Sequence, residues 1–177
     1  MNQKRRSVIQ TDRLCLCAIQ DADEEALLQI LTDPRVYATF MVPDLKSSEE
    51  AHRMFVRIKS LSDSEDRFVY GVYLDGTLIG LVNEVEKIED SIELGFAIHP
   101  AHQRKGFATE ILAACIVELF EMGFASVITG AFAENVASIR VMEKCGMTKL
   151  EKTESVEYRG EIHSCVFFSK SNTLCLC

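Results

Sequence analysis

The sequence predicts an α/β fold in which helices cover a mixed sheet, and three observations support this prediction. Stretches of alternating apolar and polar residues, typical of strands, are interspersed with segments whose apolar residues recur at helical spacing. Asp75–Gly76 separates two of the strand-like stretches and is typical of a tight hairpin turn. No linker, repeat or low-complexity segment divides the 177 residues. We therefore predict one domain over residues 1–170, followed by a loose tail at 171–177.

The first half of the chain is predicted to begin with a strand and two capped helices. Arg13–Ile19 alternates in polarity and predicts the strand. Asp21–Leu31, and a second segment from Ser47 to about residue 59, each begin with an Asp or Ser followed three residues later by Glu, which is the capping-box pattern of a helix start. Phe68–Leu74 and Thr77–Val85 then form the two strands of the predicted hairpin.

The second half is predicted to contain the longest helix and the remaining strands. That helix repeats apolar residues at a spacing that buries one face, and Gly123 ends it. Asn135 is placed to cap a shorter helix. In order, the predicted elements are a central strand at Ser91–His99, the helix at Gly106–Met122, a strand at Ser126–Phe132, a helix from Asn135 to about residue 144, and a hairpin of Met147–Val156 with Ile162–Ser169.

The loop between the central strand and the long helix has the pattern Gln103-x-x-Gly106-x-Ala108. Gly106 lets the backbone approach a ligand closely, and Ala108 leaves the helix start uncluttered. Successive backbone N–H groups and the positive end of the helix dipole would together bind an anion such as a diphosphate. Arg104 and Lys105 add positive charge for hydrogen bonds to phosphate oxygens. The alternative is an ordinary strand–loop–helix connection with solvated basic residues.

In this context the sequence resembles the GNAT acetyltransferases, and within them the RimJ/RimL-like branch, which acetylates amino groups from acetyl-CoA. The resemblance covers nearly the whole chain. It implies the GNAT fold, with a mixed, mostly antiparallel twisted sheet of about six to seven strands flanked by about four helices. Besides the loop motif, the segments that carry the resemblance are Thr11–Leu14 as an opening strand, Asp33–Val36 as the exit of the first helix, Val127–Phe132, Asn135–Met147, and Tyr158–His163 in the last hairpin.

The resemblance implies acetyl-CoA as the acetyl donor. No metal is expected, because His99 and His102 have no third ligand at helical or strand spacing. The resemblance places the thioester in a gap between the central strand and the next one, with the pantetheine arm along the backbone of Phe96, Ala97 and Ile98 and an oxyanion-stabilising N–H near Ala97 or Ile98. Asn135 and Ser138 match positions that contact the cofactor from the other side, although they could instead be no more than a helix cap and its neighbour. The residues expected at the diphosphate are Gln103, Arg104, Lys105, Gly106, Phe107, Ala108 and Thr109.

Amide formation needs an amine that has lost its proton, so a general base is expected. Glu93 lies on the central strand just before the cofactor stretch, and it matches a glutamate that serves as base in the histone-acetylating GNAT branch. Its spacing to Gln103 differs from that branch by about one residue, an offset that a β-bulge can absorb. Glu84, at the end of the preceding strand, is the rival candidate. For both, the alternative is a strand carboxylate that pairs with a cation.

One departure from the family concerns the leaving group. Many GNAT enzymes carry a tyrosine, proposed to protonate the departing thiolate, where this chain has Met142. Cys145 lies nearby, but direct attack of the amine on the thioester is preferred because the central strand contains no cysteine. The predicted protein is thus a GNAT N-acetyltransferase acting on a primary amine, with an N-terminal peptide amine favoured over a small molecule. The alternative is an acetyl-CoA-binding sensor or regulatory module without transferase activity.

Charge and composition argue against several classes of function. The net charge of −8 and the pI near 5.1 disfavour nucleic-acid binding, which needs concentrated positive charge. No run of about 18 or more apolar residues occurs, and no signal-peptide core follows the basic Lys4–Arg6 segment. We therefore expect a cytoplasmic protein that meets an amine substrate and neither nucleic acid nor a membrane. Family analogy suggests a homodimer formed through the terminal hairpin.

Overall fold

The computed structural model describes residues 4–173 of the chain, and its central feature is an eight-stranded sheet within those residues. The strands are β1 Ile9–Gln10, β2 Cys15–Cys17, β3 Val69–Leu74, β4 Thr77–Ile88, β5 Ser91–Ile98, β6 Ser126–Phe132, β7 Thr148–Tyr158 and β8 Glu161–Ser171. Their order across the sheet is β1-β2-β3-β4-β5-β6-β8-β7. Neighbouring strands are antiparallel except for β5 and β6, which run parallel.

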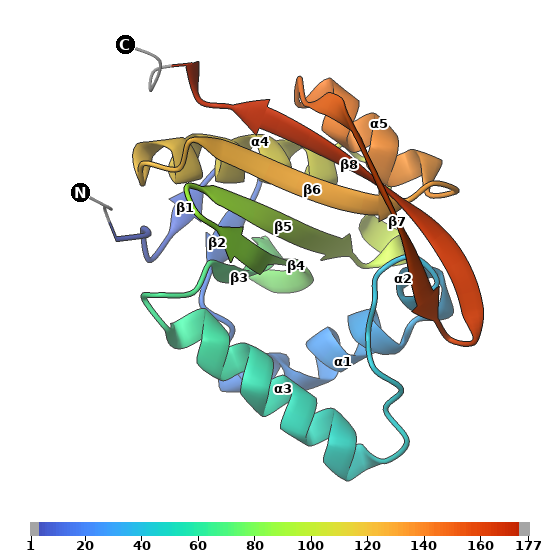
Figure 1. The fold of residues 1–177 in the computed structure, drawn as a ribbon. Coiled ribbons are helices and arrows are strands. Elements are labelled where there is room, and N and C mark those ends of the chain that lie inside the picture. Colours follow the sequence, from blue (N-terminus) through green and yellow to red (C-terminus); the bar gives the residue numbers. More distant parts are fainter. Residues whose placement is uncertain (1–3, 174–177) are drawn as a thin grey trace.

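Helices cover both faces of the sheet (Figure 1). They are α1 Glu24–Thr32, α2 Pro34–Tyr37, α3 Ser48–Asp63, α4 Phe107–Glu121 and α5 Val136–Lys144, with short 3₁₀ turns η1 Asp21–Asp23 and η2 Pro100–His102. One core contains Leu94 of β5 and Ile111 of α4. A second contains Leu27 of α1, Phe55 of α3 and Leu81 of β4. Across residues 4–173, the helices lack the combination of length and apolar content that spanning a lipid bilayer would require.

The architecture confirms the predicted α/β class with a mixed, mostly antiparallel sheet, but it contains more elements than the sequence predicted. β1 is two residues long, which is too short for alternation to reveal. α2 is the other addition. Asp33 ends α1, as predicted, and it also caps this new helix, because its side chain accepts a hydrogen bond from the Arg35 N–H (2.9 Å) and Pro34 supplies the first helical residue.

Two predicted helix boundaries move. α1 begins at Glu24 and not at residue 21, because the residues before it form η1. The reciprocal cap at this end uses Gln20 and Asp23, with the Gln20 N–H donating to Asp23 Oδ2 at 2.7 Å. α3 continues beyond Lys59 to Asp63, and these two residues form an ion pair across its last turn (3.0 Å).

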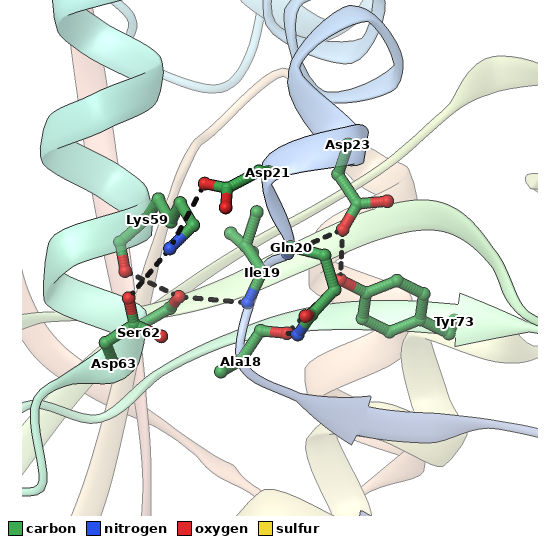
Figure 2. A network of polar contacts seen from close by, with 9 residues as sticks. All are labelled: Ala18, Ile19, Gln20, Asp21, Asp23, Lys59, Ser62, Asp63 and Tyr73. Carbon is green, nitrogen blue, oxygen red and sulfur yellow. Dashed lines mark hydrogen bonds and ion pairs between the residues drawn. The ribbon is translucent and has the colours of Figure 1, made fainter.

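A polar network ties the segment between β2 and α1 to α3 and β3 (Figure 2). The backbone N–H of Ile19 donates to the hydroxyl of Ser62 (3.0 Å), which is fully buried near the end of α3. Lys59 pairs with Asp21 of η1 at 3.4 Å. The Tyr73 hydroxyl of β3 donates to a carboxylate of η1 at 2.5 Å. These contacts hold the α1 and α3 layer against the sheet, and α1 leads directly into α2.

The parallel strands β5 and β6 separate partway along their length. Their pairing ends where Leu94 lies opposite Thr129. Beyond that point β5 continues to Ile98 beside β4, while β6 continues to Phe132 beside β8. The sheet therefore opens between these two strands, at the end of β5 that leads into α4.

The last described residues pack against the domain. Ser171 still belongs to β8, and the backbone N–H of the buried Asn172 donates to the carbonyl oxygen of Ala125 at 2.8 Å. Of the tail predicted at 171–177, these first two residues are therefore held in place. Residues 174–177 lie outside the part of the chain that the structure describes.

Gly80 of β4 leaves no room for a side chain, because a Cβ there would lie 2.4 Å from the carbonyl oxygen of Ala97 on β5. A backbone atom cannot move aside without shifting the strand. We expect Gly80→Ala to lower the free energy of unfolding by about 2 kcal/mol and the thermal midpoint by about 5 °C, measured by circular dichroism. Gly95→Ala is the matched control, since its Cβ would lie 3.3 Å or more from its neighbours. A Gly80→Ala midpoint equal to that of the control would contradict this packing.

Candidate functional site

A cavity of about 690 Å³ lies between the end of β5, the start of α4 and the start of α5. α2 and the residues that follow it form the remaining wall. The structure brings the predicted cofactor residues together here, with the exception of Lys105, which does not line the cavity. The predicted residues on the wall are Phe96, Ala97, Ile98, Gln103, Arg104, Gly106, Phe107, Ala108, Thr109, Asn135 and Ser138.

The loop between β5 and α4 is tightly folded. The Gln103 side chain donates from Nε2 to the carbonyl oxygen of Ile98 (2.9 Å), which ties the loop back to the strand. Arg104 and Gly106 have positive φ angles of 62° and 82°, and Gly106 is the N-terminal cap residue of α4. The backbone conformation itself therefore favours glycine at this position. Because Gly106 and Phe107 line the cavity, the positive end of the helix dipole faces it.

Cationic side chains surround the cavity, although the chain carries a net charge of −8. They are Arg35 from α2, Arg104 from the loop, and Arg140 and Lys144 from α5, and the described lining residues include neither Asp nor Glu. Arg35 makes a two-point contact with Asp33, at 2.7 and 3.0 Å, and these hydrogen bonds lower the pKa of Asp33 to about 2. With Arg35 paired to Asp33, the positive charge that suits an anionic ligand comes from Arg104, Arg140 and Lys144.

Asn135 and Ser138 face the cavity from the start of α5. Asn135 Oδ1 accepts a hydrogen bond from the Ser138 N–H (3.1 Å), and Asn135 Nδ2 donates to the Ser138 hydroxyl (2.9 Å). Asn135 is thus the helix cap that the sequence predicted. The cap also fixes the orientation of both side chains on the cavity wall.

Glu93 lies on β5 opposite Ile128 of β6, one pair before the two strands separate. Its neighbours on the strand, Ile92 and Leu94, pack in the core beneath α4, so the alternation of side chains places Glu93 on the opposite face of the sheet. Glu93 Oε1 is 3.4 Å from where a Cβ on Gly130 would be, so this glycine leaves space for the carboxylate. Burial raises the pKa of Glu93, and the charge of nearby carboxylates adds to this while Lys152 opposes it. Glu93 does not line the cavity described above.

Glu84 is buried and bound by three partners. Its carboxylate accepts from the Phe68 N–H (2.7 Å) and pairs with Arg67 (2.6 Å) and Lys87 (3.1 Å). Glu84 does not line the cavity. Its contacts are those of a strand carboxylate that pairs with cations, which was the alternative to a catalytic role. A β-bulge was expected between Glu93 and Gln103. The bulge is instead on the neighbouring strand β4, between Glu84 and Glu86, and Glu86 is the residue that pairs with Glu93.

Met142 and Cys145 belong to the core beneath the site. Met142 is fully buried at the position where many GNAT enzymes carry tyrosine. Cys145 Sγ donates to the carbonyl oxygen of Thr109 at 3.5 Å, and burial raises the pKa of its thiol. A thiol held neutral in this way is a poor nucleophile.

Several wall residues were missed by the sequence reasoning. Those of α5 follow from helical spacing after Asn135, so a helical projection could have found them. Those of α2 and the following residues had no comparable signal. The missed residues are Arg35, Val36, Thr39, Phe40, His102, Val136, Ala137, Arg140, Val141 and Lys144.

Within residues 4–173, no group of three or more His, Cys, Asp or Glu side chains could hold a metal ion.

The turn between β7 and β8 holds the segment that follows α2. The Tyr158 hydroxyl donates to the carbonyl oxygen of Tyr37 (2.8 Å) and accepts from the Val42 N–H (3.2 Å). Arg159 stacks over the Tyr37 ring at 4.1 Å and pairs with Asp44 at 2.5 Å. The contacts fix the wall formed by residues 35–40 and join it to the β7–β8 turn.

Comparison with known proteins identifies the family. The family model described as an acetyltransferase (GNAT) domain matches residues 13–148, which is more than half of the chain. The chain belongs to the GNAT acetyltransferase family. This result confirms the predicted family, the predicted GNAT fold and the predicted class of N-acetyltransferase.

Individual relatives agree with the family assignment. The uncharacterized N-acetyltransferase YoaA of Bacillus subtilis is 28% identical over 147 residues, which cover 80% of this chain and 83% of YoaA. A GNAT acetyltransferase from Bacillus anthracis is 25% identical with a TM-score of 0.77, covering 93% of this chain and 98% of that one. RimL, a ribosomal L7/L12 alpha-N-protein acetyltransferase solved with coenzyme A, shares the fold at 18% identity with a TM-score of 0.79, covering 93% of this chain and 97% of its own.

The Tyr158 hydroxyl provides a direct test of how the wall is held. Tyr158→Phe would leave the Tyr37 carbonyl and the Val42 N–H without this partner, so we expect it to cost about 1–2 kcal/mol of unfolding free energy. Hydrogen exchange read by mass spectrometry should show faster exchange in residues 38–46. Tyr37→Phe is the control, because it keeps the ring under Arg159 and removes a hydroxyl that has no hydrogen bond within the described residues. Unchanged exchange in Tyr158→Phe would contradict the arrangement.

Proposed function

We propose that this GNAT acetyltransferase moves the acetyl group of acetyl-CoA to a primary amine, with Glu93 as the general base. The observation that carries the proposal is the cavity that combines the edge of β5, the positive end of α4 and several cationic side chains. Acetyl-CoA has an extended pantetheine arm and a diphosphate, and these two parts match the strand edge and the helix start. GNAT acetyltransferases use acetyl-CoA, and RimL, which shares this fold, was solved with coenzyme A.

The backbone of β5 supports the assignment of the pantetheine arm. The His99 N–H donates to the carbonyl oxygen of Ile79 on β4 (2.8 Å). N–H groups alternate between the two edges of a strand, so those of Phe96 and Ile98 point away from β4, toward the opening beside β6. They can pair with amide groups of the pantetheine arm. By the same alternation the Ala97 N–H points to β4, which leaves Ile98 as the better candidate to stabilise the oxyanion.

In the proposed reaction the amine nitrogen attacks the thioester carbonyl carbon. The C–N bond forms, the C–S bond breaks, and Glu93 accepts the proton that the ammonium group must lose, either directly or through one water. Glu93 suits this role because it lies beside the point where β5 and β6 separate. Its raised pKa makes the carboxylate a stronger base than that of an exposed glutamate.

The leaving thiolate needs no dedicated acid. With Met142 buried in the core, the side chain at the usual tyrosine position has no proton to donate. A thiol with a pKa of about 8.5 leaves readily, and water can supply its proton. Transfer is direct in this scheme, since Cys145 is buried and its thiol is hydrogen-bonded to the Thr109 carbonyl.

The acceptor that we favour is an N-terminal peptide amine, with a small-molecule amine as the alternative. A terminal amine has a pKa of about 8 and needs less help in losing its proton than a lysine at about 10.4, which suits a single carboxylate base. Two proteins that share this fold are described as acting on such an amine: RimL on L7/L12, and a Salmonella typhimurium enzyme on the N-terminal serine of that ribosomal protein. Cytoplasmic location and a homodimer through the β7–β8 hairpin stay predictions.

A sensor module that binds acetyl-CoA without transfer is the second candidate, and the buried Met142 is the observation that favours it. Incubating the protein with acetyl-CoA and a panel of amines separates the two. The panel would contain short peptides with an N-terminal serine and small primary amines, and mass spectrometry would follow acetylated product and free CoA. Amine-dependent product supports the transferase, whereas cofactor binding without product across the panel supports the sensor.

Glu93→Gln tests the general base. We expect kcat to fall about 100-fold at pH 7, with the KM for acetyl-CoA little changed, because only proton removal is lost. The wild-type rate should fall as the pH drops through a value above the ordinary glutamate pKa of 4.5, since protonation inactivates the base, and this acid limb should be absent in the variant.

Cys145→Ala is the matched control for that experiment. It should keep turnover close to that of the wild type if transfer is direct. A Glu93→Gln rate within about threefold of the wild type would rule out Glu93 as the base, given the expected size of general-base catalysis. Loss of turnover in Cys145→Ala would instead point to an acetyl-cysteine intermediate.

A further inference from the structure

Arg13, between β1 and β2, reaches the start of α4 and contacts it in several ways. Its guanidinium makes a two-point contact with Glu110 in the first turn of α4, at 2.7 and 2.6 Å, and stacks over the Phe107 ring at 4.5 Å. Nη1 also donates to the carbonyl oxygen of Lys105 in the loop, at 2.9 Å. Arg13 does not line the cavity, so it acts on the loop from behind.

The anchor for Arg13 is itself well fixed. Glu110 Oε1 accepts from the Thr11 hydroxyl (2.6 Å) and from the Arg13 backbone N–H (3.0 Å), while Oε2 receives the guanidinium. Burial of Glu110 opposes ionisation, but these hydrogen bonds outweigh it and lower the pKa of the carboxyl. The pair therefore stays ionised at neutral pH, and the guanidinium is held with one N–H directed at the loop.

The bond to Lys105 determines which way a particular peptide unit points. The Lys105 C=O and the Gly106 N–H belong to the same peptide unit, which is trans, so the two groups point in opposite directions. With the C=O turned toward Arg13, the N–H is turned away from it. Gly106 lines the cavity, while Arg13 Nη2 lies on its other side, 3.4 Å from where a Cβ on Gly106 would be.

We propose that Arg13 is a positioning residue for the donor's diphosphate: by holding the Lys105 carbonyl, it turns the Gly106 N–H toward the cavity. The same contact keeps a carbonyl dipole of unfavourable sign away from the phosphate oxygens. Arg13 acts through the loop and not by touching the phosphate, since its charge is already paired with Glu110. The inference rests on the proposed function, in which the loop and the start of α4 bind acetyl-CoA.

Calorimetric titration with CoA measures the effect on binding. We expect Arg13→Ala to raise the Kd about fivefold to tenfold. This is the effect of losing one charge-assisted hydrogen bond, the one from the Gly106 N–H to a phosphate oxygen. Arg13→Lys keeps the positive charge but loses the planar fork, so it should raise the Kd at least about threefold. Arg53→Ala is the control, because this arginine pairs with Glu49 on α3, and its Kd should stay within about twofold of the wild type.

The peptide unit itself can be observed, because the sequence contains a single Lys–Gly pair, Lys105–Gly106. Labelling lysine carbonyl carbons with ¹³C and glycine nitrogens with ¹⁵N gives one NMR cross-peak that reports this unit alone. In the wild type, CoA should shift the Gly106 amide proton. In Arg13→Ala the Lys105 carbonyl signal should move before any ligand is added, and the shift caused by CoA should become smaller.

The outcomes separate this inference from the function on which it rests. Absence of CoA binding by the wild type would remove both. A wild type that binds CoA, together with an Arg13→Ala Kd within about twofold of it, would overturn the positioning role alone. The role would also be overturned by a raised Kd with an unchanged Lys105–Gly106 signal, or by Arg13→Lys binding as the wild type does. If Arg13→Ala fails to fold, Arg13→Lys provides the same two readouts.

Discussion

The separation of β5 from β6 beyond Leu94 is the constraint on which the rest of the site depends. In a continuous sheet the backbone groups of each strand are paired by its neighbours, and where two strands part, the facing groups need another partner. An extended arm with amide groups can supply it. Gly80 lets β4 stay close to β5 through this region. β5 then leads through one short loop into α4, which places a helix N-terminus beside the opening.

The charge of the cavity wall differs from the net charge of the chain. Cationic side chains from α2, the loop and α5 line the cavity, where the donor's phosphates are proposed to lie. Carboxylates, among them Glu93 and its neighbours Glu86 and Glu154, lie outside the cavity wall, with Lys152 close to them. An acidic protein can therefore hold an anionic cofactor locally while its overall charge of −8 favours the approach of a cationic amine. The loop conformation depends in turn on contacts made from behind, among them the hydrogen bond from Arg13 to the Lys105 carbonyl.

The sequence predicted those parts of the site that are local in the chain. The loop Gln103–Ala108 and the helix it opens could be recognised because the turn residues, the positive charges and the helical spacing lie within a few turns of one another. The wall at 35–40 could not, since it is held by Tyr158, which lies 121 positions beyond Tyr37. The sequence left open whether Glu84 is a base or an ion-paired carboxylate, because two of its three partners, Arg67 and Phe68, lie on the other side of the hairpin turn.

The central claim is that the cavity holds acetyl-CoA, and the thermal midpoint of unfolding, measured with and without this cofactor, tests it most directly. A ligand that binds the folded state alone stabilises it by about 2.7 kcal/mol when present at about 100 times its Kd. For a domain of this size, that gain corresponds to a rise of roughly 5–10 °C. The account predicts such a rise with acetyl-CoA. An unchanged midpoint at millimolar acetyl-CoA would contradict it.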